Sequence, residues 1–109
     1  MIERDITSFE ARVYEATCLI PRGMVTTYAM IGRIIGCRSP RAIGQALRRN
    51  PNMPEVPCHR VISSDLTLGG YSGERAGPSL EQKRRLLKAE GVVFVDDRLA
   101  NESQLWSGD

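Results

Sequence analysis

A cysteine, a histidine and an arginine follow one another at Cys58, His59 and Arg60, directly after a proline-rich loop. Thiolate is the reactive form of cysteine, and a nearby imidazole or guanidinium group favours it. The three residues could therefore form an activated nucleophile. Neighbouring residues need not meet side chain to side chain, so on local chemistry alone a buried structural cysteine is the better interpretation.

The other two cysteines, Cys18 and Cys37, stand at irregular distances from Cys58. An odd number of cysteines leaves at least one free thiol, and this spacing is not that of a disulfide framework. The chain holds one histidine and no CxxC pair, so we expect no structural zinc and no other metal. Cys18 is expected in the core of a first helix, and Cys37 has no assigned role.

Positive charge is concentrated in the middle of the chain. Residues 22–60 contain seven arginines and a single acid, Glu55, which gives this segment a charge of about +6 although the whole chain has +2. Such a basic centre is typical of a polyanion-binding face. A solvated charged surface has the same signature, and charge alone does not separate the two.

Two helices are expected in the first third of the chain. Ser8 can cap a helix over residues 9–20, in which Phe9, Val13, Ala16 and Ile20 share one face, and Pro21 ends it. Thr26 or Thr27 begins a second helix over residues 28–35. Gly36 follows it at a position that favours a left-handed backbone.

A third helix is predicted over residues 41–49, because Ser39 and Pro40 are a typical N-cap and first helical residue. Its short connection to the second helix is typical of a helix-turn-helix, whose second helix commonly lies in a DNA groove. The outward positions would be Arg41, Gln45, Arg48 and Arg49, and the inward positions Ile43, Ala46 and Leu47.

The last part of the chain is expected to add a short strand at Val61–Ile62, a helix from about Ser79 to Glu90 and a strand over residues 91–95. A polar and partly mobile tail would follow. We predict one domain over residues 1–109, with a core of about residues 9–95 and a tail over residues 96–109. No apolar run is long enough to cross a membrane and the N-terminus is charged, which indicates a soluble intracellular protein.

Four segments change the interpretation of Cys58: RAIGQALRRNP at 41–51, PCHRV at 57–61, GGYSG at 69–73 and KRRLLKAEG at 83–91. In sequence and spacing they resemble the C-terminal domain of the O6-alkylguanine-DNA alkyltransferases. The resemblance implies a mainly α fold with short β elements and a helix-turn-helix, similar to a winged helix. It also implies a monomer that needs no cofactor and acts on double-stranded DNA containing O6-alkylguanine.

The resemblance assigns catalytic roles to five residues. Cys58 would be the nucleophile that keeps the alkyl group, and His59 the base, acting through a water. Glu90 would orient His59, in the manner of other activated nucleophiles. Asn50 would tie the DNA-binding helix to the active-site loop, and Tyr71 would donate its hydroxyl to the leaving purine.

DNA-binding roles follow in the same way. Arg41 would enter the base stack from the minor groove and replace the extruded guanine, while Tyr28 presses on the neighbouring phosphate. Extrusion is needed because a base atom inside the duplex is out of reach. The remaining assignments are Gln45, Arg48 and Gly44 for DNA contact, and Val61, Ser72, Leu47 and Gly69 for the guanine pocket.

Two alternatives stay open. We expect that the domain that precedes this one in most alkyltransferases is absent, as in the alkyltransferase-like proteins, which bind alkylguanine without transferring the group and recruit nucleotide excision repair. Those proteins commonly replace the cysteine and carry arginine at the position of Tyr71, so Cys58 and Tyr71 favour an enzyme. A helix-turn-helix transcription regulator would leave PCHRV and GGYSG unexplained.

Overall fold

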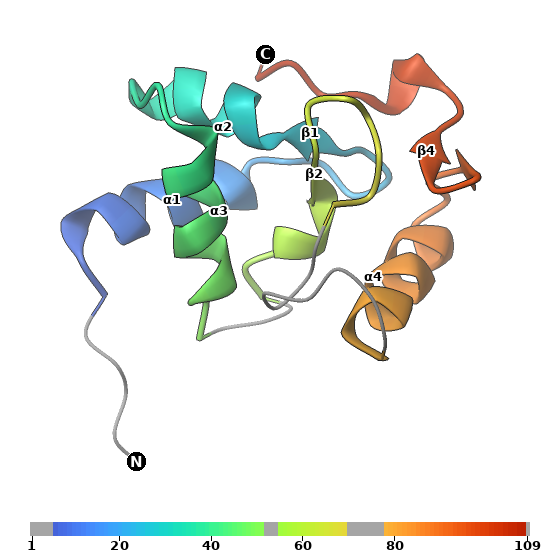
Figure 1. Cartoon of the computed structure of the whole chain (residues 1–109), viewed down its shortest axis with the longest axis horizontal. Helices are drawn as coiled ribbons and strands as arrows, with labels where there is room; N and C mark the ends of the chain where they lie inside the picture. Colours follow the sequence, from blue (N-terminus) through green and yellow to red (C-terminus); the bar gives the residue numbers. More distant parts are fainter. Residues whose placement is uncertain (1–5, 52–54, 70–77, 109) are drawn as a thin grey trace.

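Three helices form the N-terminal half of the molecule: α1 (Ser8–Cys18), α2 (Tyr28–Ile35) and α3 (Pro40–Arg48). The computed structural model describes residues 6–51, 55–69 and 78–108. In Figure 1 the turn between α2 and α3 lies at one end of the molecule, and α4 and β4 lie at the other. The structure thus has the predicted helix-turn-helix, with α3 beginning one residue earlier than expected.

Side-chain caps explain where these helices begin and end. Thr7, rather than the expected Ser8, caps α1 and forms a reciprocal capping box with Glu10. Thr27 caps α2, and Gly36 ends it with a left-handed φ of 77°. Ser39 accepts a hydrogen bond from the Ala42 amide at the start of α3. The sequence prediction for α2 and for the cap of α3 is confirmed.

The three helices enclose one hydrophobic cluster. Val13, Ile31 and Ile43, one from each helix, are fully buried within it. The Tyr14 hydroxyl donates a 2.7 Å hydrogen bond to the Ala46 carbonyl, which joins α1 to α3. Cys58 belongs to the same cluster, so the packing of α3 bears directly on the position of its sulfur.

Short strands connect the helical half to the rest. β1 (Thr26–Thr27) pairs in parallel with β2 (Val61–Ile62), with Thr26 opposite Val61. The expected strand at Val61–Ile62 is confirmed. The 3-10 turn η1 (Cys58–Arg60) precedes β2 directly, so β1 anchors the segment that carries Cys58.

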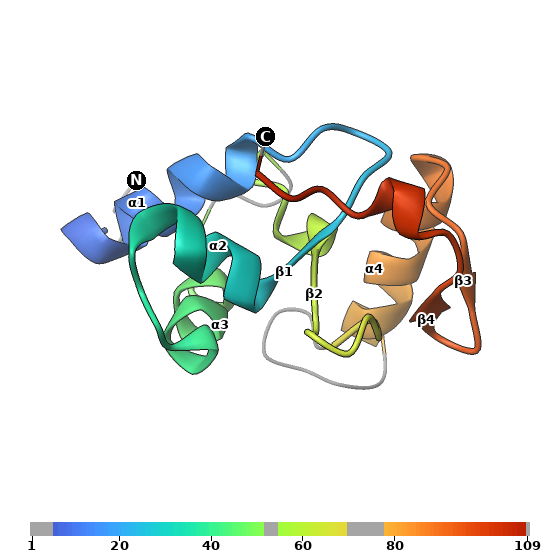
Figure 2. The ribbon, with the colours of Figure 1, turned by 90° about the horizontal axis from the view of Figure 1, so that it is seen from above.

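The second half packs around α4 (Pro78–Ala89), which begins one residue before the expected Ser79 and so contains it. Gly91 has a φ of 85°, and the Val92 amide donates to the Leu87 carbonyl, an arrangement that ends the helix as predicted. Figure 2 shows α4 at one end of the molecule, with β3 (Phe94–Val95) and β4 (Arg98–Leu99) beside it. The terminal strand is shorter than the residues 91–95 predicted for it.

The C-terminal segment, predicted as a polar tail, packs against the rest of the fold through residues 104–106. After η2 (Glu102–Gln104) the chain runs beside Val25, whose amide donates to the Gln104 carbonyl at 2.9 Å. The Trp106 amide donates to the Val25 carbonyl at 2.7 Å, and the Trp106 ring joins the first core cluster. Burial of the Trp106 ring stabilises the packing of the C-terminal segment against the core.

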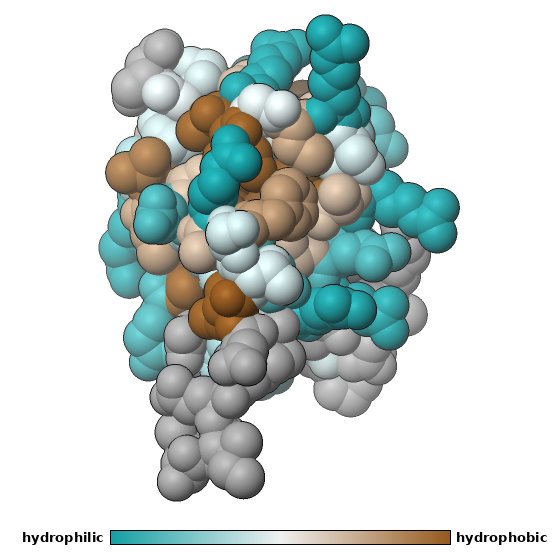
Figure 3. All heavy atoms as spheres, turned by 90° about the vertical axis from the view of Figure 1, so that its left-hand side faces the viewer, coloured by the Kyte–Doolittle hydropathy of each residue, from teal (hydrophilic) through white to brown (hydrophobic). Residues whose placement is uncertain are grey.

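The surface corrects one further expectation. Cys18 is exposed, because the buried face of α1 is formed by Val13, Ala16 and Thr17. Figure 3 looks onto the end that carries the turn between α2 and α3, and shows apolar surface bordered by hydrophilic side chains. Among the helices of the described residues, none has the length and apolar character that crossing a bilayer requires.

Candidate active site and DNA-binding helix

Cys58 opens the 3-10 turn η1, and its residue is only 6% exposed. The Cys58 amide donates to the Val56 carbonyl at 2.8 Å, and the Val61 amide donates to the Cys58 carbonyl. Both ends of the turn are therefore fixed by backbone hydrogen bonds. Cys58 lies against the core formed by Leu47 and Val61, at the point where that core meets the loop before it.

Asn50 links this loop to the end of α3. Its side-chain amide donates a 3.1 Å hydrogen bond to the Val56 carbonyl, and the residue is buried. Val56 in turn accepts from the Cys58 amide, so two hydrogen bonds connect Asn50, just after α3, with the backbone of Cys58. The contact expected of Asn50 is confirmed.

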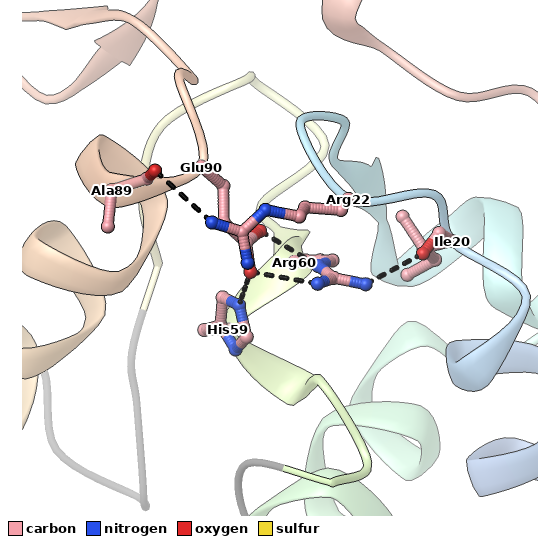
Figure 4. A network of polar contacts seen from close by, with 6 residues as sticks. All are labelled: Ile20, Arg22, His59, Arg60, Ala89 and Glu90. Carbon is pink, nitrogen blue, oxygen red and sulfur yellow. Dashed lines mark hydrogen bonds and ion pairs between the residues drawn. The ribbon is translucent and has the colours of Figure 1, made fainter.

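His59 faces away from the loop toward the end of α4. Its Nε2 lies 3.0 Å from Glu90 Oε2, and the residue is 2% exposed (Figure 4). Its Nδ1 is buried and has no hydrogen-bond partner among the described residues. Burial lowers the pKa of His59, against the opposing influence of Glu90. The ring is therefore neutral near pH 7, with Nε2 donating to Glu90 and Nδ1 free to accept a proton.

The Glu90 carboxylate contacts both His59 and Arg60. Arg60 donates from Nε and Nη2 to the two carboxylate oxygens at 2.9 and 2.8 Å, and from Nη1 to the Ile20 carbonyl at 2.9 Å. Arg22 donates to the neighbouring Ala89 carbonyl (Figure 4). Burial raises the pKa of Glu90, but the hydrogen bonds from Arg60 and His59 outweigh it and lower the pKa to about 2. The carboxylate is charged throughout the physiological range.

Lys83 is the member of the site that sequence reasoning missed. It is 0% exposed, and its ammonium donates to the carbonyls of Val61, at 2.9 Å, and of Leu68. Burial lowers the pKa of Lys83 to about 7, against the attraction of Cys58. A signal was present, since Lys83 stands on the apolar face of α4 between Leu80 and Leu87, where a cation is costly without partners.

The outer face of α3 carries the residues expected to contact DNA. Arg41, Gln45 and Arg48 are all exposed there, whereas Ile43 and Leu47 are buried beneath them. None of the three exposed side chains has a hydrogen bond or ion pair with another described residue. This face is free to meet a ligand.

Tyr28 starts α2 and lies between two glycines. A Cβ atom at Gly44 would be 4.0 Å from the Tyr28 ring, and one at Gly69 would be 3.4 Å from its hydroxyl. Gly69 also has a φ of 70°, which disfavours any larger residue. Tyr28 is partly exposed, next to Gly44 of α3 and Gly69.

Two of the residues assigned to the guanine pocket, Val61 and Leu47, are buried core residues, and the carbonyl of Val61 accepts a hydrogen bond from Lys83. Tyr71 and Ser72 lie outside the described residues. Within the described residues, no three histidine, cysteine or acidic side chains come together as they would to hold a metal ion.

The chain is similar to known proteins over most of its length. Residues 8–92 match the model of the 6-O-methylguanine DNA methyltransferase DNA-binding domain. The methylated-DNA–protein-cysteine methyltransferase of Pyrobaculum aerophilum is 46% identical over 77 residues, which are 71% of this chain and 48% of the relative. The relative of the same name from Archaeoglobus fulgidus is 45% identical over 79% of this chain and 58% of its own. The chain thus spans about half the length of these relatives.

Solved structures agree. S. pombe Atl1 in complex with damaged DNA containing O6-carboxymethylguanine has a TM-score of 0.79 and 30% identity, over 94% of this chain and 98% of Atl1. Mycobacterium tuberculosis OGT in complex with DNA has a TM-score of 0.70 and 40% identity, over 80% and 51% of the two chains. The chain belongs to the family of the 6-O-methylguanine DNA methyltransferase DNA-binding domain.

Proposed function

We propose that this protein repairs DNA by transferring the alkyl group of O6-alkylguanine to Cys58, irreversibly and once per molecule. The observation that carries the proposal is the chain of contacts that begins at His59, the residue after Cys58, and runs through Glu90 to Arg60. A structural cysteine needs no such arrangement. The relatives named as methylated-DNA–protein-cysteine methyltransferases supply the reaction class.

The proposed reaction consists of one proton transfer and one alkyl transfer. His59 Nδ1, whose lone pair is available, takes the thiol proton, directly or through a bridging water. The Cys58 sulfur then forms a bond to the alkyl carbon while the bond between that carbon and O6 breaks. The electron pair of the broken bond stays with guanine, which receives one proton as it leaves, equivalent to the proton that His59 took from the thiol. Tyr71 is the proposed hydrogen-bond donor to the departing purine.

Glu90 and Lys83 stabilise the charged forms that this step requires. The imidazolium formed at His59 lies against a carboxylate that Arg60 keeps ionised. The attraction between the Lys83 ammonium and a Cys58 thiolate is mutual, so it favours the thiolate. In a buried site, such fixed charges act more strongly than they would in water.

The exposed face of α3 is the proposed route by which guanine reaches Cys58. Arg41 would occupy the stack after extrusion, and Tyr28 would press on the adjacent phosphate. Gln45 and Arg48 would contact the groove and backbone, with Gly44 allowing close approach. Extrusion costs a few kcal/mol, and least for a damaged base, which helps to select the lesion. The protein would act as a monomer inside the cell, on double-stranded DNA.

A damage sensor that binds alkylguanine without removing the alkyl group is the second candidate. The observation that favours it is the match to S. pombe Atl1 over 98% of that chain, in a complex with damaged DNA. A sensor would recruit downstream repair proteins. The thiol and its buried partners argue for transfer instead.

Mass spectrometry distinguishes the two candidates. The reduced protein is incubated with a duplex that contains one O6-methylguanine, and its intact mass and tryptic peptides are measured. Transfer adds one methyl group, located on Cys58, and the Cys58→Ala variant binds the lesion without gaining mass. An unmodified parent protein on a duplex that it binds tightly would rule out transfer and leave the sensor.

A further inference from the structure

The turn between α2 and α3 contains a cavity of about 560 Å³ that the proposed reaction does not use. Its walls are formed by Ala29, Gly32 and Arg33 of α2, by Cys37 and Arg38 of the turn, and by Pro40 at the start of α3. In Figures 1 and 2 this turn lies at the opposite end of the molecule from α4, β3 and β4. It therefore adjoins the α3 face and is remote from the C-terminal hairpin.

The cavity is positively charged. Arg33 and Arg38 are exposed, and neither has a hydrogen bond or ion pair with any described residue. Among the described residues, no acidic side chain lines the cavity. By contrast, Arg60 and Arg84 are both held by carboxylates. Two unpaired guanidinium groups beside one hollow form a site suited to an anion, and planar guanidinium groups match phosphate oxygens.

The wall of the cavity is held in a fixed shape. The Cys37 amide donates to the Gly32 carbonyl at 2.7 Å, and Arg12 of α1 donates to the carbonyl of Ile35. A Cβ atom at position 32 would lie 2.5 Å from the Cys37 carbonyl oxygen, so only glycine fits there. The hollow is consequently present before any ligand arrives, and binding need not order the turn.

We propose that this cavity binds a backbone phosphate of the duplex beyond the segment that α3 contacts, with Arg33 and Arg38 as its ligands. The inference rests on the proposed function, since it requires α3 to lie on DNA. Pro40 lines the cavity and directly precedes Arg41, so the cavity continues the arginine-bearing face of α3. A duplex in contact with Arg41 would present its next phosphates to this end of the molecule.

The first test is the salt dependence of binding to a long lesion-containing duplex. Each lost phosphate contact reduces the magnitude of the negative slope of log K against log salt by about 0.9, so R33Q/R38Q, which removes both ligands of one phosphate, is expected to reduce it by about 0.9. Arg85→Gln on α4, also exposed and unpaired, is the matched control and should leave the slope unchanged. On a duplex shortened to the segment under α3, R33Q/R38Q should bind like the parent.

The second test follows two free thiols in the unmodified protein. Cys37 lines the cavity and Cys18 is exposed on α1, so both can be alkylated by a maleimide and quantified by peptide mass spectrometry. An undamaged long duplex should protect Cys37 and leave Cys18 reactive. Equal labelling with and without DNA, together with an unchanged salt slope in R33Q/R38Q, would overturn the proposal. A parent protein that binds no lesion-containing duplex would overturn the proposed function as well.

Discussion

The buried site around Cys58 and the exposed face of α3 organise their charges in opposite ways. Glu90 accepts hydrogen bonds from both His59 and Arg60, and Lys83 is bound by two backbone carbonyls. On α3, Arg41 and Arg48 point into solvent without a partner among the described residues. The first region is organised in the free protein, and under the proposed function the second becomes organised on DNA.

Under the proposed function, this difference separates two kinds of contribution to repair. Preorganised charges in a dry site act on the rate of the chemical step, because they need no rearrangement when charge develops. Exposed arginines act on affinity, because they replace counterions on the DNA backbone and lose strength with added salt. Substitutions around Cys58 should therefore change the rate of transfer, whereas substitutions on the exposed face of α3 should change the affinity for DNA.

The largest effect is expected for Glu90→Gln. Loss of the carboxylate leaves His59 and Arg60 without their shared anion, so the rate of methyl transfer should fall about 100-fold or more while lesion affinity changes little. Single-turnover kinetics and equilibrium binding measure the two quantities. Glu102→Gln, an exposed acid on η2, is the control. A transfer rate equal to that of the parent would remove Glu90 from the proposed mechanism.

Glu90→Gln also tests the stability of the buried network. The pKa of Glu90 is lowered from 4.5 to about 2, so its contribution to folding is fully present above pH 4.5 and is lost as the pH falls toward 2. Denaturant unfolding near pH 7 should show the variant less stable by about 3 kcal/mol. The difference between parent and variant should shrink below pH 4.5, and a gap independent of pH would show that the carboxylate is not ionised in this way.

Arg41→Ala should have the second-largest effect on methyl transfer. Without a side chain to fill the stack, methyl transfer from duplex DNA should fall about 50-fold, which corresponds to a few kcal/mol of extrusion cost. Transfer from a single strand should fall much less, because no base pair has to be opened. Rates on the two substrates provide the comparison. Equal losses on both would exclude the proposed role in extrusion.

Lys83→Met should have a moderate effect on transfer and a distinctive effect on stability. Loss of the ammonium is expected to slow transfer about tenfold, which corresponds to about 1.4 kcal/mol of thiolate stabilisation. Because the pKa of Lys83 is lowered from 10.5 to about 7, the unfolded chain binds more protons between these values. The unfolding free energy of the parent should therefore rise relative to the variant from pH 7 toward 10.5. Lys88→Met, exposed on the same helix, should match the parent, and an identical profile for Lys83→Met would contradict the assignment.

Arg48→Gln should have the smallest effect. One phosphate contact on the exposed face changes the slope of log K against log salt by about 0.9, and affinity at low salt by a few-fold. The transfer rate at saturating DNA should be that of the parent. A slower saturated rate would mean that the separation between the two regions is wrong.

The sequence was sufficient wherever local chemistry decides the structure. Thr27 begins α2 because its side chain caps a helix amide, and Gly36 ends α2 because it adopts a left-handed conformation. Ser39 and Pro40 begin α3 for similar reasons. The resemblance of PCHRV to the alkyltransferases then identified Cys58, His59 and Glu90, and the structure brings the last two into contact.

What the sequence did not reveal depends on contacts between distant segments. Lys83 reaches carbonyls 15 and 22 residues away, and Trp106 joins a core built from the first helices. The sequence predicts Cys18 inside the core, but it is exposed, because the buried face of α1 is the one formed by Val13 and Thr17. On a short helix such as α1, the apolar periodicity is too weak to predict which face is buried.

A titration of protein against a fixed amount of duplex bearing O6-methylguanine tests the central claim most directly, with restored guanine and S-methylcysteine at position 58 counted together. The proposed function predicts that both rise in equal amounts and stop at one per protein molecule. If the lesion is bound but its methyl group stays on the DNA at every ratio, Cys58 is not an acceptor and the account is contradicted.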